Sequence, residues 1–280
     1  MNRKTHVLLI VSCMLGAAAT SAATTALSED FNALSIGSNL SERDSALDFV
    51  RTAGSEPHFG SLNIQASNIG TGNSLILKSS GYGSSPNLTG VGASKLPSSE
   101  VWSLSMDIKS PIWTSGTYLY IMMGTGRSNS QQVYSQTGPI TTTGVSPSTI
   151  GSQSLFALKL NGSTMLNGGY FSAITDTGME YDSSGAVMTN GTAYALHIVV
   201  NGSESDLMVD KITIPTGMMG IYLNGNFSAM FPIATKLSAD SLRILAAGNS
   251  VGNGSVSIEI DNLKIWNSSV SPRSHKSNLR

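Results

Sequence analysis

Apolar and polar residues alternate with a period of two along most of this 280-residue chain. The even-numbered residues from Trp102 to Ile108 are apolar and those between them are polar, which predicts a half-buried β-strand. The one helical pattern covers Asn39 to Phe49, with Ser41 and Asp44 as a weak capping box. Further strands are predicted at 75–77, 155–160, 194–200, 207–214 and 242–245.

The last predicted strand, Val256 to Trp266, changes phase along its length. Its apolar residues occupy even positions up to Ile260 and odd positions from Leu263 onward. One extra residue at Asp261-Asn262 explains the slip, because a strand that keeps its buried face through an insertion needs a β-bulge. The pattern therefore predicts a bulged strand with acidic residues near the end of a β-rich chain.

The Asn-Gly pairs of the chain include those at Asn161, Asn190, Asn201, Asn224 and Asn253. This dipeptide favours the positive φ angles of tight hairpin turns. The strand at 194–200, a loop at 201–206 and a strand at 207–214 are expected to form one hairpin. The polar stretch 128–154 is either a surface loop or one that lines a site.

The first 22 residues have the pattern of a secretory signal peptide. Arg3 and Lys4 precede an apolar stretch, and small residues near Ala22 offer a cleavage site. A retained membrane anchor is the alternative, but the strongly apolar part is too short for a full span. A second alternative is lipidation at Cys13, since Ile10–Cys13 resembles a lipobox. We therefore expect a protein that is secreted or held at the cell surface, with no membrane span in the mature chain.

The expected mature chain is one domain, residues 23–266, followed by a basic, disordered tail at 267–280. Loss of Arg3 and Lys4 with the leader gives a net charge of about −3, so there is no basic field for nucleic acid. The single cysteine of the chain, Cys13, lies in the leader. The mature fold must therefore be held by a sizeable core rather than by disulfides.

Three segments carry a resemblance to a known superfamily: Ser28–Gly37, Tyr194–Gly202 and Ile258–Ile265. Together they resemble the concanavalin A-like, laminin-G-like jelly rolls of exported bacterial proteins, in which an early acidic-Phe strand lies near the last strand. The resemblance implies an all-β fold, a two-sheet antiparallel β-sandwich with one concave sheet that often binds glycans. It supports the fold much better than any activity.

The last strand also resembles the catalytic strand of the glucanases in this superfamily, which carries three carboxylates. Glu259 and Asp261 occupy two of the three places, but Lys264 stands where the third carboxylate would be. Retaining hydrolysis requires a second carboxyl group as the acid, so this comparison argues against a hydrolase.

A structural calcium ion is a more suitable use for these acidic residues. Calcium takes six to eight oxygen ligands, and a bulge frees backbone carbonyls beside Asp261. If the first and last strands are neighbours, Glu29, Asp30 or Asn32 completes the set of metal ligands. The alternative is that all three are exposed edge residues, since no compact calcium loop is present.

A glycan-binding platform is predicted from tyrosines on outward strand faces. Tyr118 and Tyr120 share one face of the stretch 117–123, and a tyrosine ring offers both apolar area and a hydroxyl. His197 is expected on an outer face, with Lys159 and Tyr170 nearby. The alternative is a central strand buried on both sides, in which His197 is a structural histidine.

The preferred function is non-catalytic recognition of a polysaccharide or glycoconjugate, so we lean against an enzyme. One alternative is a polysaccharide lyase that uses Tyr118, Tyr120, His197 and Arg243 to neutralise a uronate and remove its proton, although no lyase motif is present. The other alternative is a structural or adhesive surface protein without a small ligand.

Overall fold

The computed structural model describes residues 23–40, 46–47, 49–51, 60–80, 88–111, 113–125, 154–177, 180–236, 238–248 and 255–274. Within these residues the regular structure is seventeen β-strands and one short 3-10 helix, η1 (Pro272–Ser274). No helix among the described residues is long and apolar enough to cross a bilayer.

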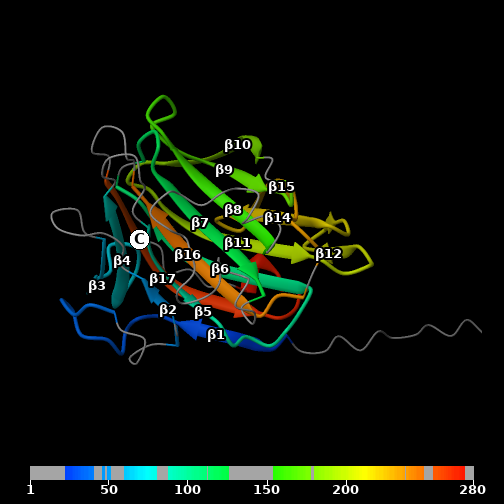
Figure 1. Cartoon of the computed structure of the whole chain (residues 1–280), viewed down its shortest axis with the longest axis horizontal. Helices are drawn as coiled ribbons and strands as arrows, with labels where there is room; N and C mark the ends of the chain where they lie inside the picture. Colours follow the sequence, from blue (N-terminus) through cyan, green and yellow to red (C-terminus); the bar gives the residue numbers. More distant parts are fainter. Residues whose placement is uncertain are drawn as a thin grey trace, which may run out of the picture.

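Eight strands form the first sheet, which we call sheet A (Figure 1). Seven of them follow in spatial order: β15 (Asn226–Pro232), β14 (Met218–Leu223), β11 (Ala193–Asn201), β6 (Val101–Lys109), β17 (Ser255–Trp266), β4 (Asn73–Ser80) and β3 (Ser61–Ala66). The eighth, β1 (Thr25–Glu29), pairs with the C-terminal half of β17, where β4 has ended. The first and last strands are therefore neighbours, as predicted.

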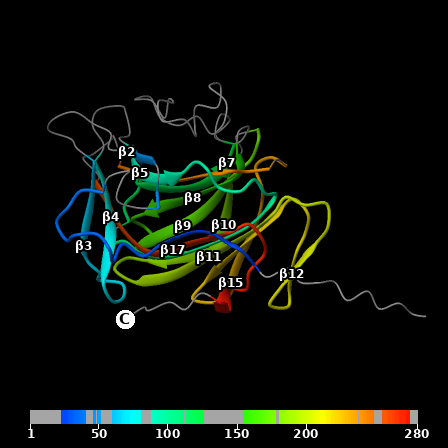
Figure 2. The same ribbon diagram turned by 90° about the horizontal axis from the view of Figure 1, so that it is seen from below.

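Seven strands form the second sheet, sheet B, which lies over sheet A (Figure 2). Their spatial order is β10 (Glu180–Thr189), β9 (Gly168–Ile174), β8 (Ser154–Ser163), β7 (Tyr118–Gly124), β16 (Ser241–Ala247), β5 (Leu88–Ala93) and β2 (Phe49–Arg51). All strand pairs in both sheets are antiparallel. The predicted all-β, two-sheet antiparallel β-sandwich is confirmed.

The core lies between the two sheets and is built by the period-two alternation. Trp102, Leu104 and Met106 of β6 face it from sheet A, and Leu119 and Ile121 of β7 face it from sheet B. All five side chains are almost completely buried. Burial of apolar side chains is the main favourable term in folding, and it needs no disulfide.

The bulge predicted in β17 is present. The pairing of β17 with β6 shifts register between Asp261 and Lys264, and Asn262 has a φ of 51°. Asparagine tolerates this left-handed conformation better than most residues. The insertion keeps Ile260 and Leu263 in the same core, on either side of the slip.

The prediction of a short helix over Asn39–Phe49 is wrong for the residues that the structure describes. Asn39 forms an isolated antiparallel bridge with Asn63, and Phe49 begins strand β2. Leu47 is buried in the core. Residues 41–45 and 48 lie outside the described residues, as do 128–153 of the polar stretch.

Strand β6 is buried on both faces, whereas the alternation predicted a half-buried strand. The side chains of Ser103, Ser105 and Asp107 on its outer face are inaccessible to solvent. A segment from the C-terminal end of the chain hydrogen-bonds to Ser103, and the loop after β3 lies over Asp261, the cross-strand partner of Asp107. Polar residues on a strand indicate that their side chains point away from the core, but other segments of the chain can still cover them.

The expected hairpin of 194–200 with 207–214 is not formed. Strand β11 pairs with β6 and β14 instead, and the segment 207–214 folds back on itself as β12 (Leu207–Val209) and β13 (Ile212–Ile214). Asp210 and Lys211 both have positive φ and make the turn. This small hairpin covers the outer face of sheet A by packing on Val199 and Tyr222.

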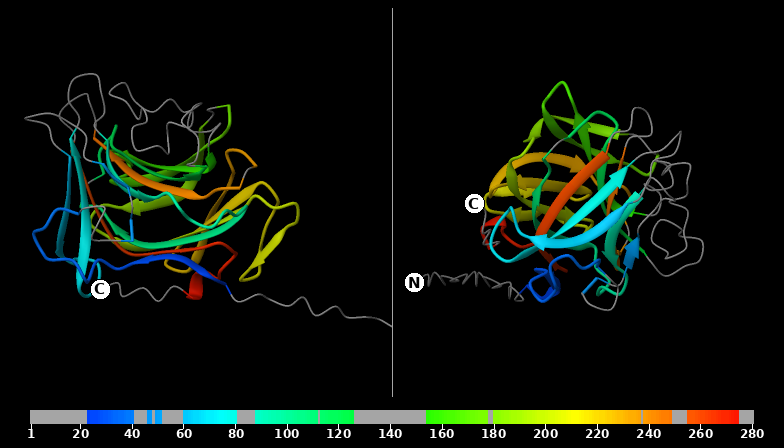
Figure 3. Two further views of the ribbon diagram at one scale, coloured as in Figure 1. Left: turned by 60° about the horizontal axis from the view of Figure 1, so that its bottom comes forward. Right: turned by 90° about the vertical axis from the view of Figure 1, so that its left-hand side faces the viewer.

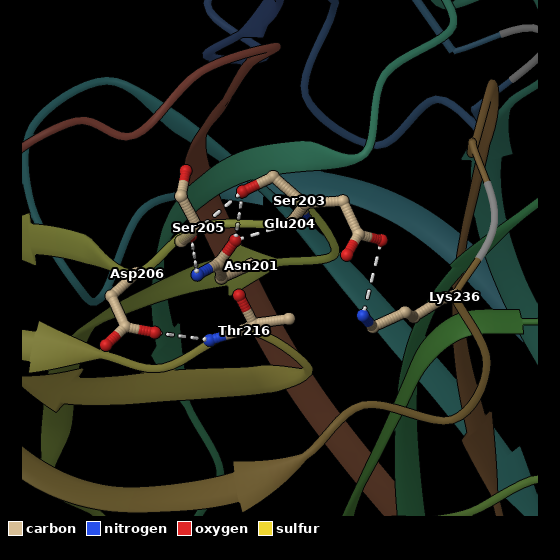
Figure 4. A network of polar contacts seen from close by, with 7 residues as sticks. All are labelled: Asn201, Ser203, Glu204, Ser205, Asp206, Thr216 and Lys236. Atoms are coloured by element: carbon tan, nitrogen blue, oxygen red, sulfur yellow. Dashed lines mark hydrogen bonds and ion pairs between the residues drawn. The ribbon is translucent and has the colours of Figure 1, made fainter.

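Asn201 holds the loop between β11 and β12, and its side chain is buried (Figure 4). Its amide nitrogen donates to the carbonyls of Ser205 and Ile214, each at 2.9 Å, and its amide oxygen accepts from Ser203. Among the Asn-Gly pairs, Asn224-Gly225 makes the predicted turn between β14 and β15, with both residues at positive φ. Asn161-Gly162 lies within β8 instead, so the turn predicted there is wrong.

Candidate functional site

Tyr118 and Tyr120 lie on the outer face of sheet B, as the alternation of β7 predicted. Both rings are half-buried and their centroids are 6.2 Å apart, at 47° to each other. They pack on a second, smaller apolar cluster that sits outside the main core and includes Met122, Ala157 and Leu245. These apolar side chains share the outer face with the tyrosines and lie beside them, while part of each ring stays accessible.

Lys159 of β8 lies beside both tyrosines. It is the cross-strand partner of Tyr120, and its Nζ is 4.4 Å from the centroid of the Tyr118 ring. An ammonium group over an aromatic ring at this distance makes a favourable cation–π contact. Because Lys159 is 9% exposed, the contact holds a largely buried positive charge at the edge of the tyrosine pair.

A chain of hydrogen bonds continues from this pair toward the edge of sheet B. Asn161 donates through Nδ2 to Ser172 Oγ at 2.6 Å, and Ser172 donates to Asp182 Oδ1 at 2.5 Å. Asn161 and Ser172 are buried, and Asp182 is exposed on the edge strand β10. Tyr170 is the cross-strand partner of Asn161, which in turn faces Tyr118, so Tyr170 shares this face.

We call this set, Tyr118, Tyr120, Lys159, Asn161, Tyr170, Ser172 and Asp182, the tyrosine platform. The structure brings together three of the four predicted ligand-binding residues, namely Tyr118, Tyr120 and Tyr170. Sequence reasoning missed Asn161, Ser172 and Asp182. The alternation within β8 and β9 places Asn161 and Ser172 outward, but only the strand pairing shows that they line up with Tyr118 and Tyr120.

His197 does not belong to the platform, and the expectation that it shares a face with the tyrosines is wrong. It lies on β11 in sheet A, on the outer face, so the whole core separates it from Tyr118. His197 is 2% exposed. Its Nδ1 is hydrogen-bonded to Ser105 Oγ, and its Nε2 donates to the carbonyl of Val270 at 2.9 Å. These contacts make it a structural histidine.

Arg243 is placed differently from His197. It lies on β16 opposite Met122, and it is fully buried. Its Nη1 donates to the carbonyls of Leu242 and Ala93, at 2.7 and 3.2 Å. The lyase set of Tyr118, Tyr120, His197 and Arg243 is therefore not assembled in one place.

The segment Asn267–Arg273, which we call the C-terminal strap, crosses the outer face of sheet A. Ser103 Oγ donates to the carbonyl of Ser268 and accepts from the Val270 amide, both at 2.8 Å. Ser271 donates to Asp210 at 2.6 Å, and Arg273 lies 3.8 Å from the same carboxylate. The expectation of a disordered tail is wrong for these residues, while 275–280 lie outside the described residues.

The strap and the β12–β13 hairpin cover a row of rings on sheet A. His197 lies 6.0 Å from Tyr222 and 6.4 Å from Trp266, measured between ring centroids. Burial raises the pKa of the Tyr222 hydroxyl, and the nearby charge of Asp210 raises it further. This face is sealed by the protein itself, so it offers no open aromatic surface at these residues.

Asp261 lies at the β17 bulge, directly opposite Asp107 of β6, and both are buried. The Asn262 side chain donates to Asp107 at 2.8 Å, and the Asn262 amide donates to Asp261 at 2.7 Å. Burial is the main cause that raises the pKa of Asp261 to about 7, with repulsion by Asp107 as a further cause. This carboxyl group is thus held partly in its neutral form near neutral pH.

Glu29 and Asp30 are engaged by the chain around them. Glu29 accepts hydrogen bonds from the amides of Phe31 and Ala46, at 2.9 and 2.8 Å, one on each carboxylate oxygen. Asp30 accepts from the Asn32 amide at 3.1 Å. Across the described ranges, no group of three His, Cys, Asp or Glu side chains is placed to hold a metal ion. Asp261, Asp30 and Glu29 are thus not gathered into one ligand set among the described residues, and calcium binding by them stays a prediction.

No protein-family model matches this chain, and no curated protein matches it. Solved structures are similar to it at low identity. Domain 4 of the arabinanase AbnA from Geobacillus stearothermophilus, in complex with arabinotriose, is 17% identical over 90% of this chain and 96% of that one, with a TM-score of 0.45. The binding domain of Paraclostridial Mosquitocidal Protein 1 is 12% identical over 89% of this chain and 50% of that one, with a TM-score of 0.47.

A sialidase is 12% identical over 73% of this chain and 16% of its own, with a TM-score of 0.41. The chain thus spans half or less of the sialidase and mosquitocidal chains. With TM-scores of 0.41 to 0.47, the likeness assigns no activity, ligand or family to this chain.

Proposed function

We propose that the tyrosine platform binds a polysaccharide or glycoconjugate without converting it. The observation that carries the proposal is the pair of half-buried rings, Tyr118 and Tyr120, which pack beside apolar side chains on the same face and are flanked by Lys159. Sugars have apolar C–H faces and polar edges. A site for them accordingly combines aromatic area with a few fixed hydrogen-bonding groups.

The polar groups of the platform suit the hydroxyls of a sugar. Asp182 is exposed and offers carboxylate oxygens, which make strong hydrogen bonds with hydroxyl donors. Its Oδ1 is already oriented by Ser172, which is oriented in turn by Asn161. A carboxylate that is held in place before binding loses less side-chain entropy when the ligand arrives.

We further infer that the sandwich is of the concanavalin A-like type and that the protein is exported by its first 22 residues. Export rests on the Arg3-Lys4 start and the apolar stretch after it, which lie outside the described residues. N-terminal sequencing of protein collected from the culture medium tests this. A mature N-terminus near Ala23 supports cleavage, and an intact Met1 contradicts it.

A glycan array followed by titration of the best ligand tests the platform. We expect Tyr118→Ala and Tyr120→Ala each to weaken binding by about tenfold or more, since loss of a stacking ring removes on the order of 1–3 kcal/mol. Phe227→Ala is the matched control. Phe227 is an aromatic residue with 40% exposure, but it lies on β15 of sheet A.

Two results would contradict this proposal. If no glycan gives a signal, or if the Phe227 variant loses as much affinity as the Tyr120 variant, the platform is not the binding face. The bound polysaccharide should also be recovered unchanged. Release of unsaturated products that absorb in the ultraviolet would show a lyase instead.

A further inference from the structure

A groove on the outer face of sheet A lies on the opposite side of the core from the tyrosine platform. Its volume is about 320 Å³, at the lower end of the range of ligand pockets. The strands around it, β3 and β4, form one end of sheet A (Figure 3). The groove is lined mainly by polar and charged residues: Gln65, Asn68, Lys78, Lys109, Ser257 and Glu259.

The strand register explains why these residues face one another. Glu259 of β17 lies between Ile76 of β4 and Lys109 of β6, as the direct cross-strand partner of both. Ser257, two residues earlier on β17, is the partner of Lys78. Residues two apart on a strand share a face, so the two lysines flank the carboxylate on the same side of the sheet.

The loop after β3 closes one end of the groove. The Asn68 amide donates to Glu259 Oε1 at 2.6 Å, and Lys109 Nζ donates to the Asn68 carbonyl at 3.3 Å. Ile76 and Pro111 add the apolar part of the lining. The groove is thus built by four strands and one anchored loop, with charged groups at fixed places along it.

Glu259 has hydrogen-bonding capacity that the surrounding chain does not use. It is 5% exposed, and its two hydrogen bonds within the described part of the chain, from Asn68 and Ser74, both end on Oε1. Both of these donors thus use Oε1, and a carboxylate oxygen makes strong hydrogen bonds, so Oε2 is suited to accept from a ligand hydroxyl in the groove.

Lys78 is the other group in the groove that is available to a ligand. It is exposed, and it makes no hydrogen bond or ion pair with any residue that the structure describes. With Lys109 it gives the groove two positive charges against the single negative charge of Glu259. The lining therefore favours a ligand that carries an acidic group together with hydroxyls.

We propose that this groove binds an acidic sugar, a hexuronate unit, free or at the end of a glycan chain. Lys78 and Lys109 take the sugar carboxylate. Glu259 Oε2 and the Gln65 amide take hydroxyls, and Ile76 contacts a C–H face. The site is independent of the tyrosine platform, because the core lies between the two faces.

Calorimetric titration of the full chain with glucuronate and galacturonate tests the groove, with glucose and inorganic sulfate as comparison ligands. We expect saturable binding of a uronate, at least about tenfold weaker binding of glucose, and a loss of affinity as salt is added, since exposed charges are screened. No saturable uronate binding would overturn the proposal. Equal affinity for sulfate would overturn the sugar assignment.

Single substitutions test whether uronate binds in this groove rather than elsewhere, and whether a lost affinity reflects lost folding. Lys78→Ala should weaken uronate binding by about tenfold with an unchanged melting temperature, because Lys78 is exposed. Lys95→Ala, an exposed lysine outside the groove, and Tyr120→Ala, on the platform, should leave uronate binding unchanged. A Lys78→Ala protein that binds as well as the wild type refutes the site, whatever the platform does.

Discussion

At the scale of single residues, the most unusual group is the Asp261 carboxyl. It is buried beside Asp107 at the bulge of β17, and its pKa is raised to about 7. A raised pKa in the folded state means that folding favours the protonated form. The stability that this group contributes is therefore complete below its unfolded pKa of 3.8 and is lost as the pH rises through about 7.

We predict that Asp261→Asn flattens this pH dependence. At pH 8 the variant should have a higher free energy of unfolding than the wild type, by on the order of 1–3 kcal/mol, because the neutral amide carries no buried charge. Its side-chain oxygen still accepts from the Asn262 amide, as the carboxylate does. Urea unfolding at pH 5 and pH 8 measures the effect.

Glu204→Gln is the control for this experiment. Its carboxylate is 89% exposed and forms a surface pair with Lys236, so the substitution should change the pH profile far less than Asp261→Asn does. A wild-type profile that is flat between pH 4 and 8, or an Asp261 variant less stable at every pH, would contradict the assignment of a destabilising buried charge.

Substitution by alanine is expected to destabilise the protein for different reasons at Gly90 and at Gly225. A Cβ at Gly90, in β5, would lie 2.1 Å from the Ile244 carbonyl oxygen of the paired strand β16. A Cβ at Gly225, in the β14–β15 turn, meets nothing within 4 Å, but φ is 76° there. Gly90 is needed for close approach of two strands, and Gly225 is needed for its backbone angle.

We predict that Gly90→Ala destabilises the protein more than Gly225→Ala. The first must displace backbone, at a cost of about 3 kcal/mol or more, while the second adds only left-handed strain of about 1 kcal/mol. Chemical denaturation of the two variants gives the comparison. Equal losses would mean that β5 and β16 move apart easily.

At the scale of elements, the C-terminal strap forms the outer layer over β6 and β11. Ser103 and His197 both hydrogen-bond to it, and both side chains are buried. It was not foreseen because its residues are polar and follow no strand or helix pattern. Their burial depends on partners more than sixty residues away, such as Asp210.

We predict that ending the chain after Trp266 lowers the melting temperature by several degrees, since it removes the hydrogen bonds to Ser103 and His197. The chain that ends after Ser274 keeps the residues that make these bonds, so it is the matched control. The chain that ends after Trp266, if it folds, should still bind glycan at the tyrosine platform. An unchanged melting temperature for that product would show that the strap adds no stability.

The elements that could be predicted are those with a strong local pattern. The alternation in β6 and β7 and the phase slip in β17 were sufficient to find strands, core residues and the bulge. The division of 207–214 into two strands was missed because Asp210 and Lys211 carry no glycine or Asn-Gly signal for the turn. His197 was misplaced because alternation gives a face of a strand, but not the sheet to which the strand belongs.

At the scale of the whole molecule, stability comes from one continuous core between two sheets. The chain has one cysteine, so no internal disulfide is possible. Both carboxylate oxygens of Glu29 are occupied by backbone amides, so the groups proposed for calcium already serve the fold. Contacts within the protein therefore hold both the end of β1, through Glu29, and the bulge in β17, through Asn262.

We predict that neither a reducing agent nor an excess of EDTA lowers the melting temperature of the purified protein, since the contacts described here need neither a disulfide nor an ion. Thermal unfolding followed by circular dichroism, with added CaCl₂ as the third condition, is the measurement. A melting temperature that falls in EDTA and recovers with calcium would instead support ligation by Asp261, Asp30 and Glu29.

Both described ends of the chain belong to the same layer. Strand β1 is part of sheet A, and the C-terminal strap crosses the outer side of that sheet, while Tyr118 and Tyr120 lie on the far side of the molecule. A tether attached at either described end would thus hold the domain from the side of sheet A. Tyr118 and Tyr120 would then point away from the support, so immobilisation through a terminal tag leaves the proposed glycan-binding face accessible for a binding assay.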